Sequence, residues 1–184
     1  MERLIESLRS APVVDMGEYN YFVHPVTDCI PLVEPALLRE IADAFRANID
    51  LDDVEKIFTA ESMGIHHATA LSLAADIPFV VARKRSYGFE GEVAVHQVTG
   101  YDDGELYVNG IEPNDRLLLL DDVFSTGGTM EAMYDAVREI GAEPVAAAVV
   151  IRRRSAEARS LPIDVVSLVE VEVVDGTVHV TPTV

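Results

Sequence analysis

The chain has 184 residues, a length that fits one domain with a sizeable core, and we predict a single domain over residues 1–184. A hydrophobic content of 49% excludes a disordered chain, and no apolar run is long enough to span a membrane. Asp and Glu number 32 against 14 Lys and Arg, and the formal net charge of −18 repels phosphate backbones, so we expect neither a nucleic-acid nor a membrane partner. The charges in Met1–Ser10 argue against a signal peptide, and we expect a cytoplasmic protein.

The strong acidity is combined with only two lysines, Lys56 and Lys84. This balance suggests a protein of a salty cytoplasm, in which screening removes much of the repulsion between like charges. An ordinary acidic protein is the alternative. The single cysteine, Cys29, excludes an intrachain disulfide and is expected to be a small buried hydrophobic residue.

The N-terminal part of the chain is predicted to contain two helices separated by an irregular segment. Apolar residues at helical spacing predict a short helix over Glu2–Arg9. Three prolines make Tyr19–Pro35 irregular. Pro35 suits the first turn of a second helix, which we expect to run to about Ala47 with an apolar stripe on one face.

From residue 54 onward, strand and helix patterns alternate. In chain order, the pattern predicts a strand at Val54–Thr59, a helix at Gly64–Ala75, a strand at Phe79–Ala82, a hairpin of Val93–Val98 and Glu105–Val108, a strand at Arg116–Leu120, a helix at Thr129–Ile140, strands at Val145–Ile151 and Val165–Val169, and a terminal hairpin at Val171–Val180. This alternation predicts an α/β fold with a mainly parallel sheet flanked by helices. In such sheets, ligands bind at the carboxyl ends of the strands.

The segment after the strand Arg116–Leu120 has the composition of a phosphate-binding site. Two adjacent carboxylates, Asp121 and Asp122, are expected as solvent-facing acids at the end of this strand. In the polar segment that follows, Gly127 and Gly128 let the backbone turn tightly and approach an anion, which the amides and dipole of the next helix attract. The segment contains no Lys and is therefore not a Walker-type loop. Carboxylates beside a phosphate site suit a ligand such as a ribose 5-phosphate.

The basic residues are clustered despite the excess of acid. Six of the 14 lie in two triplets, Arg83-Lys84-Arg85 and Arg152-Arg153-Arg154. Because a chain this acidic still clusters its cations, we expect the first triplet to bind an anion. For the second triplet, anion binding and a solvated face paired with neighbouring carboxylates are equally good alternatives.

Leu117–Met130, with its hydrophobic strand, acid pair, polar loop and helix, resembles the phosphoribosyl-pyrophosphate (PRPP) signature of type I phosphoribosyltransferases. The resemblance implies that Asp121 and Asp122 are catalytic residues that hold the ribose hydroxyls. The residues that would bind the 5-phosphate are Ser125, Thr126, Gly127, Gly128 and Thr129. The resemblance extends to Asp28–Val33, which is similar to a purine-side N-terminal segment, and to Phe58–Gly64, where the family has its pyrophosphate loop.

The same resemblance assigns further roles. The pyrophosphate loop would comprise Ala60, Glu61, Ser62, Met63 and Gly64. Arg83 and Lys84 would be catalytic residues that supply positive charge to the pyrophosphate, and about residues 84–110 would form a flexible flap. A small hood would be formed by about residues 1–35 with the C-terminal hairpin. The residues expected to line the base pocket are Phe22, Val26 and Phe124, with a core role as the alternative for the first two.

Two residues indicate which purine enzyme the chain resembles. Thr27 stands where adenine-type enzymes usually have an Arg, and Ser125 stands where bacterial and eukaryotic hypoxanthine–guanine enzymes usually have an Asp. The pattern therefore resembles the archaeal hypoxanthine/guanine branch, and the acidic composition suggests a haloarchaeal member. We expect a purine salvage enzyme that converts a purine base and PRPP into a nucleoside 5′-monophosphate and pyrophosphate. An adenine phosphoribosyltransferase, an orotate enzyme and a non-enzymatic PRPP-sensing regulator are the alternatives.

The resemblance also implies a cofactor and an oligomer. Mg²⁺ would be held through PRPP near Asp121 and Asp122, without a direct protein ligand, because this ion keeps several of its waters. The protein would be a homodimer. Proton transfer has three candidates by position alone, namely Glu61, Glu90 and Glu92.

Overall fold

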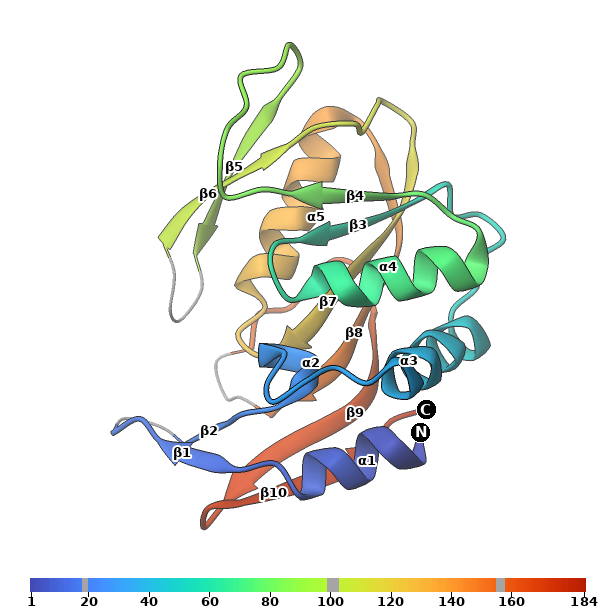
Figure 1. Ribbon diagram of the computed structural model, residues 1–184. Coiled ribbons are helices and arrows are strands. Elements are labelled where there is room, and N and C mark those ends of the chain that lie inside the picture. The colour runs from blue at the N-terminus through green and yellow to red at the C-terminus, as the bar shows by residue number, and fades with distance from the viewer. Residues whose placement is uncertain (18–19, 99–102, 155–157) are drawn as a thin grey trace.

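A six-stranded sheet forms the centre of the molecule in a computed structural model that describes residues 1–17, 20–98, 103–154 and 158–184 (Figure 1). In spatial order its strands are β10 (Thr177–Pro182), β9 (Val165–Val174), β8 (Glu143–Arg153), β7 (Arg116–Phe124), β3 (Lys56–Ala60) and β4 (Phe79–Ala82). Neighbouring strands are parallel, except that β10 is antiparallel to β9. The predicted α/β fold with a mainly parallel sheet is therefore confirmed.

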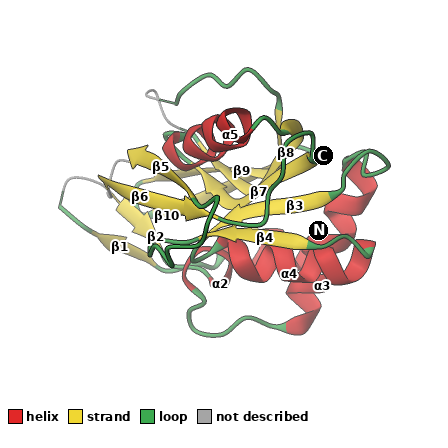
Figure 2. Ribbon diagram, turned by 90° about the horizontal axis from the view of Figure 1, so that it is seen from above, coloured by secondary structure: helices red, strands yellow, loops and turns green. Residues whose placement is uncertain are grey.

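Helices cover both faces of this sheet, as Figure 2 shows. The described helices of more than one turn are α1 (Glu2–Arg9), α3 (Pro35–Asn48), α4 (Gly64–Ala75) and α5 (Gly128–Ile140). α3 and α4 lie on one face and α5 on the other, while α1 packs against β10 and α3. Their bounds agree with the predicted helices to within one residue. Within the described ranges, no helix is long and apolar enough to cross a membrane.

β7 divides the hydrophobic core into two clusters. Leu118 and Leu120 belong to the cluster beneath α3 and α4, whereas Leu117 and Leu119 belong to the cluster beneath α5. All four side chains are fully buried. Successive residues of a strand point to opposite faces, so a strand covered on both faces is apolar throughout. This burial fixes the position of the residues that follow Leu120.

Smaller elements surround the sheet. They are β1 (Val13–Asp15), which pairs with β2 (Asn20–Phe22), the short helix α2 (Pro25–Asp28), and the antiparallel pair of β5 (Val93–Val98) and β6 (Asp103–Val108). The prediction that Tyr19–Pro35 is irregular is wrong for β2 and α2, and Tyr19 itself lies outside the described residues. The reason is local, because the ring of His24 accepts a hydrogen bond from the Val26 amide at 3.2 Å and caps α2.

The structure corrects three further expectations. β7 ends at Phe124 rather than at Leu120, because its pairing with β8 continues as far as Phe124 opposite Arg152. The predicted strand Val165–Val169 and the first arm of the terminal hairpin form one continuous strand, β9. Cys29 is exposed rather than buried, because it ends α2 in a left-handed conformation.

Replacement of Phe45 tests the cluster beneath α3 and α4. The ring is fully buried, so Phe45→Ala should lower the free energy of unfolding by about 3–5 kcal/mol through lost burial and the cavity left behind. Urea denaturation followed by circular dichroism measures this loss. Leu32→Ala is the control, because Leu32 is 58% exposed and its truncation should cost less than about 0.5 kcal/mol. Equal losses in the two variants would contradict the assigned core.

Candidate functional site

A pocket of about 240 Å³ opens where β3 and β7 end. Its lining residues are Ala60, Glu61, Ser62, Met63 and Lys84, together with the continuous run from Asp121 to Met130. The pocket therefore brings together three segments that are far apart in the sequence. These are the predicted pyrophosphate loop, the first basic triplet and the predicted phosphate-binding segment.

The acid pair lies inside β7, with its side chains at the base of this pocket. Asp121 and Asp122 are each 7% exposed, so the prediction of solvent-facing acids beyond the strand is wrong. The amide of Asp122 donates a hydrogen bond of 3.0 Å to Oδ1 of Asp121. Burial raises the pKa of both carboxyls, and the charge of Asp121 raises the pKa of Asp122 further. Loss of hydration and mutual repulsion therefore favour a shared proton or a bound positive charge.

The predicted phosphate-binding segment packs against an aromatic ring. Gly127 has a φ of 86°, and a Cβ atom at this position would lie 2.7 Å from the ring of Phe124. The guanidinium carbon of Arg152 lies 4.9 Å from the centre of the same ring, in a cation–π contact. Glycine is thus required at position 127 by conformation and by space. The turn leads directly into α5, whose first amides lack intrahelical acceptors and suit an anion.

The predicted pyrophosphate loop packs closely against β3 and the acid pair. The peptide bond between Glu61 and Ser62 is cis. A Cβ atom on Gly64 would lie 2.0 Å from Oγ1 of Thr59 and 3.0 Å from Oδ1 of Asp121. Gly64 does not line the pocket, but its lack of a side chain allows α4 to begin against the acid pair.

The first basic triplet is divided between two roles. Lys84 lines the pocket, whereas Arg83 does not. Nε of Arg83 lies 3.0 Å from Oε2 of Glu61, and the backbone of Arg83 exchanges hydrogen bonds with that of Tyr107 in β6, at 2.9 and 2.7 Å. The structure therefore places one of the two predicted cations at the pocket and the other in an ion pair beside it.

A second pocket, of about 170 Å³, adjoins the first. It is lined by Tyr21, Phe22, Thr27, Asp122, Val123, Ser125 and Arg153. Asp122, Val123 and Ser125 are shared by the two pockets. Phe22 is thus at this second pocket and Phe124 at the first, as wall residues. Val26 is at neither, because its side chain is buried in the core.

Asp28 organises the wall of the second pocket. Its two carboxylate oxygens accept hydrogen bonds from the Tyr21 hydroxyl at 2.7 Å, the Thr27 hydroxyl at 2.6 Å and the His24 amide at 3.0 Å. Burial and the neighbouring carboxylate of Asp28 raise the pKa of Tyr21 above its ordinary value. The sequence analysis did not identify Tyr21, and it considered Thr27 only as a position that distinguishes purine enzymes.

The second basic triplet does not form a single anion site. Arg154 forms ion pairs with Glu170 at 2.6 Å and Glu172 at 3.3 Å, as the solvated-face alternative expects. Arg152 donates a hydrogen bond of 2.8 Å to the carbonyl of Val165. Arg153 lines the second pocket and donates a hydrogen bond of 2.9 Å to the carbonyl of Asn20. Its position in the triplet was the signal that could have identified it.

The candidates for proton transfer are otherwise engaged or exposed. One carboxylate oxygen of Glu61 accepts a hydrogen bond from the Lys84 amide, and the other forms an ion pair with Arg83. Glu92 accepts hydrogen bonds from the side chains of Ser86 and Asn109, and these bonds lower the pKa of Glu92 to about 2. Glu90 is exposed. Glu92 therefore holds the start of the predicted flap together and is a weak proton acceptor.

Comparison with known proteins decides the family. A family model described as the phosphoribosyl transferase domain matches residues 33–180. The chain belongs to the phosphoribosyltransferase family. It is 54% identical over 179 residues to the hypoxanthine/guanine phosphoribosyltransferase of Methanocaldococcus infernus, covering 96% of this chain and 98% of that protein. It is 51% identical over 180 residues to HGPRTase-like protein 3 of Haloterrigena turkmenica, covering 98% and 97%.

Solved structures agree with this assignment at the level of the fold. An adenine phosphoribosyltransferase from Thermoanaerobacter pseudethanolicus superposes with a TM-score of 0.77 at 17% identity, over 91% of this chain and 99% of that one. A second adenine phosphoribosyltransferase, from Rhodothermus marinus, has a TM-score of 0.74 at 26% identity, over 92% and 99%. This phosphoribosyltransferase therefore has the fold that the PRPP-signature resemblance implied.

The buried acid pair of the phosphoribosyltransferase should reduce its stability at neutral pH. A carboxyl whose pKa is raised by folding stabilises the folded state below about pH 4, and this contribution is lost as the pH rises. Asp122→Asn should therefore raise the free energy of unfolding at pH 8 by about 1 kcal/mol or more, with a smaller gain at pH 5.

Urea denaturation of wild type and variant at both pH values measures this difference. Asp53→Asn is the control, because the side chain of Asp53 is 78% exposed and its removal should change stability little. Destabilisation by Asp122→Asn at pH 8 would contradict the assigned burial and repulsion.

Proposed function

We propose that this phosphoribosyltransferase is a purine salvage enzyme that transfers the phosphoribosyl group of PRPP to hypoxanthine or guanine, forming a nucleoside 5′-monophosphate and pyrophosphate. The observation that carries the proposal is the pair of adjoining pockets that share Asp122, Val123 and Ser125. One suits a phosphorylated sugar and the other a flat base, so that a glycosidic bond would form at their junction. Two relatives about half identical over nearly their full length, named as hypoxanthine/guanine or HGPRTase-like, support the same substrate class.

The larger pocket would bind PRPP. The 5-phosphate would lie on the N-terminus of α5, held by Ser125, Thr126, Gly127, Gly128 and Thr129. Asp121 and Asp122 would accept hydrogen bonds from the ribose hydroxyls. The loop Ala60–Gly64, of which all but Gly64 line the pocket, would bind the pyrophosphate together with Lys84.

The donor set of the pocket fits Mg²⁺ bound through the substrate. Carboxylates are the ligands that this ion prefers, and Asp121 and Asp122 line the pocket. Within the described ranges, no group of three His, Cys, Asp or Glu side chains could hold a metal ion by itself. Asp121 and Asp122 would therefore hold Mg²⁺ through water or the ribose hydroxyls. When bound, the ion supplies neutralising charge to the pyrophosphate.

The residues of the chain would stabilise departure of the pyrophosphate more than they would activate the base. Lys84 and the amides of the loop Ala60–Gly64 would balance the charge that develops on the leaving group. A flap over about residues 84–110, with a hood of about residues 1–35 and the C-terminal hairpin, would exclude water from the electron-poor ribosyl carbon. All these parts would act within a single domain.

Arg153 favours a 6-oxopurine over adenine. A guanidinium carries only hydrogen-bond donors, so at the wall of the base pocket it would bind the carbonyl oxygen of hypoxanthine or guanine. Adenine has an amino group at the same position, so that two hydrogen-bond donors would face each other. Preference for adenine and a non-enzymatic PRPP sensor are the outcomes that the assay below distinguishes.

The assay measures pyrophosphate release from PRPP and Mg²⁺ with hypoxanthine, guanine, adenine or xanthine at multimolar KCl. We expect kcat/KM for hypoxanthine or guanine to exceed that for adenine at least about tenfold, because a guanidinium donor left without an acceptor in the adenine complex is costly. Arg153→Met should reduce this preference about tenfold. Arg154→Met is the matched control, because Arg154 pairs with Glu170 and Glu172 outside both pockets. Tight PRPP binding without turnover of any base would contradict the enzyme.

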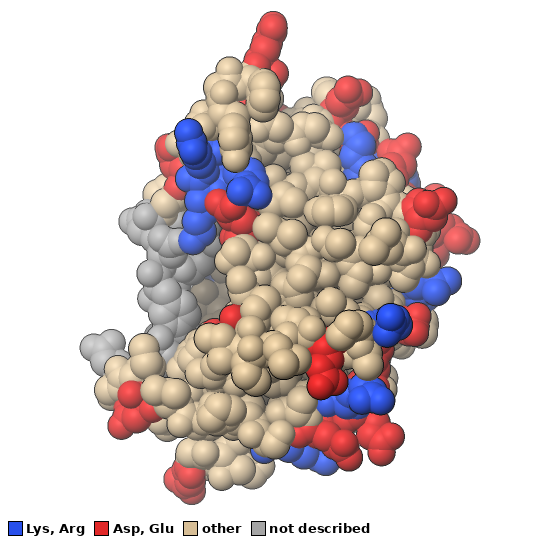
Figure 3. Space-filling view, in the orientation of Figure 1, with Lys and Arg blue, Asp and Glu red and all other residues tan. Residues whose placement is uncertain are grey.

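We further propose a homodimer that forms through a groove between α3 and α4. The groove, of about 570 Å³, is lined mostly by apolar residues, and its two charged residues are Arg39 and Asp43, one of each sign. α4 carries no charged residue, and Figure 3 shows a broad uncharged surface in the part of the molecule where Figure 1 places this helix. A twofold interface must be self-complementary, and an uncharged face avoids the repulsion between two strongly acidic chains.

Leu73 tests this face, because its side chain is 84% exposed beside the groove. Leu73→Asp should convert a dimer into a monomer, as measured by sedimentation velocity at high KCl. Leu32→Asp is the control, because Leu32 is exposed but does not line this groove. A wild-type monomer, or a dimer unaffected by Leu73→Asp, would contradict the proposed interface.

We also propose that the protein functions in a haloarchaeal cytoplasm. The 32 acidic residues against 14 basic ones support adaptation to high salt, in which screening removes repulsion between surface carboxylates. Relatives from Haloterrigena turkmenica and Haloquadratum walsbyi are about half identical to this chain, in agreement with such a source.

A further inference from the structure

Glu61 connects the pyrophosphate loop to the strand that carries the basic triplet. Its Oε1 accepts a hydrogen bond of 2.5 Å from the backbone amide of Lys84, and its Oε2 lies 3.0 Å from Nε of Arg83. The amide of Glu61 in turn donates to the carbonyl of Ala82 at 3.0 Å. Side chain and backbone of Glu61 thus contact three consecutive residues at the end of β4.

This arrangement determines which cation faces the pocket. The carboxylate of Glu61 compensates the charge of Arg83, which does not line the pocket. The same carboxylate holds the backbone of Lys84, a residue that does line the pocket. The side chain of Glu61 is 18% exposed and that of Arg83 is 42% exposed, so water partly screens this ion pair.

We propose that Glu61 is a positioning residue, which directs Lys84 to the leaving pyrophosphate by holding the Lys84 amide and the Arg83 guanidinium. The inference rests on the proposed function and identifies a residue that acts through Lys84. A lysine side chain has a flexible four-carbon stem, so a fixed backbone narrows the region that its ammonium group can reach. The anchor also limits motion at the start of the flap, since Arg83 is bonded through its backbone to Tyr107 of β6.

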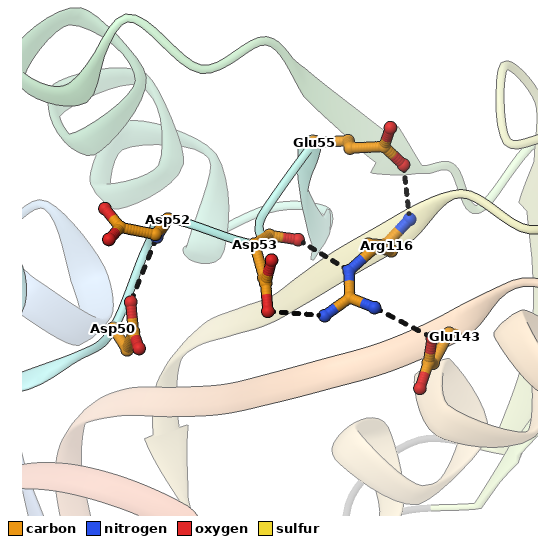
Figure 4. A network of polar contacts seen from close by, with 6 residues as sticks. All are labelled: Asp50, Asp52, Asp53, Glu55, Arg116 and Glu143. Carbon is orange, nitrogen blue, oxygen red and sulfur yellow. Dashed lines mark hydrogen bonds and ion pairs between the residues drawn. The ribbon is translucent and has the colours of Figure 1, made fainter.

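The structure offers a matched control at the opposite end of the sheet. Figure 4 shows Arg116 at the start of β7, with its guanidinium bonded to Asp53 and Glu143. Glu143 lies 3.4 Å from Arg116 and, like Glu61, is an acid paired with a strand-end arginine. Glu143→Ala therefore removes an ion pair of a strand-end arginine that has no contact with either pocket, although Glu143 is more exposed than Glu61.

The experiment compares wild type, Glu61→Ala, Glu61→Gln and Glu143→Ala by calorimetry and by kinetics. The binding probes are inorganic pyrophosphate with Mg²⁺ and, separately, ribose 5-phosphate. We expect Glu61→Ala to weaken pyrophosphate binding and to raise KM for PRPP about tenfold, as the loss of one charged hydrogen bond predicts. Affinity for ribose 5-phosphate should stay within about twofold, since α5 and the segment Ser125–Thr129 are untouched.

Glu61→Gln separates the effect of the hydrogen bond to the Lys84 amide from the effect of the negative charge of Glu61. A glutamine oxygen still accepts a hydrogen bond from the Lys84 amide, so this variant should recover most of the pyrophosphate affinity, to within about threefold of wild type. Glu143→Ala should match wild type with both probes. A merely structural role for Glu61 would lower the affinity for ribose 5-phosphate and the unfolding midpoint together, which would overturn the inference.

The remaining outcomes separate this inference from the function on which it rests. If wild type turns over a purine and binds pyrophosphate, and Glu61→Ala does both equally well, the positioning role is overturned. The enzyme assignment then stays intact. A wild-type protein that neither binds pyrophosphate nor turns over any purine would overturn both.

Discussion

The site depends on how tightly β7 is enclosed. Leu117 to Leu120 are buried alternately beneath α5 and beneath α3 and α4, so the strand cannot shift along its axis without moving two cores. Its pairing with β8 continues through Asp121 and Asp122, which places two carboxylates in a region with little water. The stability of the apolar part thus offsets the cost of an acid pair that repels itself. The turn at Gly127, the loop after β3 and both pockets are arranged around this pair.

Local patterns were sufficient for most of the fold. Helices could be predicted to within one residue, because their apolar stripes and their Pro and Gly boundaries are local signals. The end of β7 could not, because two acids break the apolar pattern that a strand prediction uses, while the pairing that extends the strand comes from β8. Similarly, α2 depends on the cap by His24, whose side chain a periodicity analysis treats as one more polar residue.

The residues that line the first pocket could be predicted from the sequence better than those that line the second. Asp121 to Thr129 are contiguous, and a contiguous segment is recognisable from composition alone. The second pocket joins β2 to the end of β8 through Arg153 and the carbonyl of Asn20, a contact across 133 positions that no local pattern indicates. For the same reason, Val26 was a reasonable candidate by position, yet its neighbour Thr27 lines the pocket. Asp28 and Glu61 act through the residues that they hold in place. Their roles therefore become clear only when the positions of those residues are known.

The acid pair belongs to a strand rather than to a loop, and this has a thermodynamic consequence. Asp121 is paired with Val149 of β8, so the backbone beneath the carboxylates is ordered before any ligand arrives. Binding then loses little conformational freedom on the protein side, and the contacts made by the carboxylates contribute almost fully to affinity. The same preorganisation makes the geometry of the site hard to adjust by small backbone shifts. Divergence of substrate preference within this architecture should therefore arise at the wall around β2 and α2, and seldom at the strand itself.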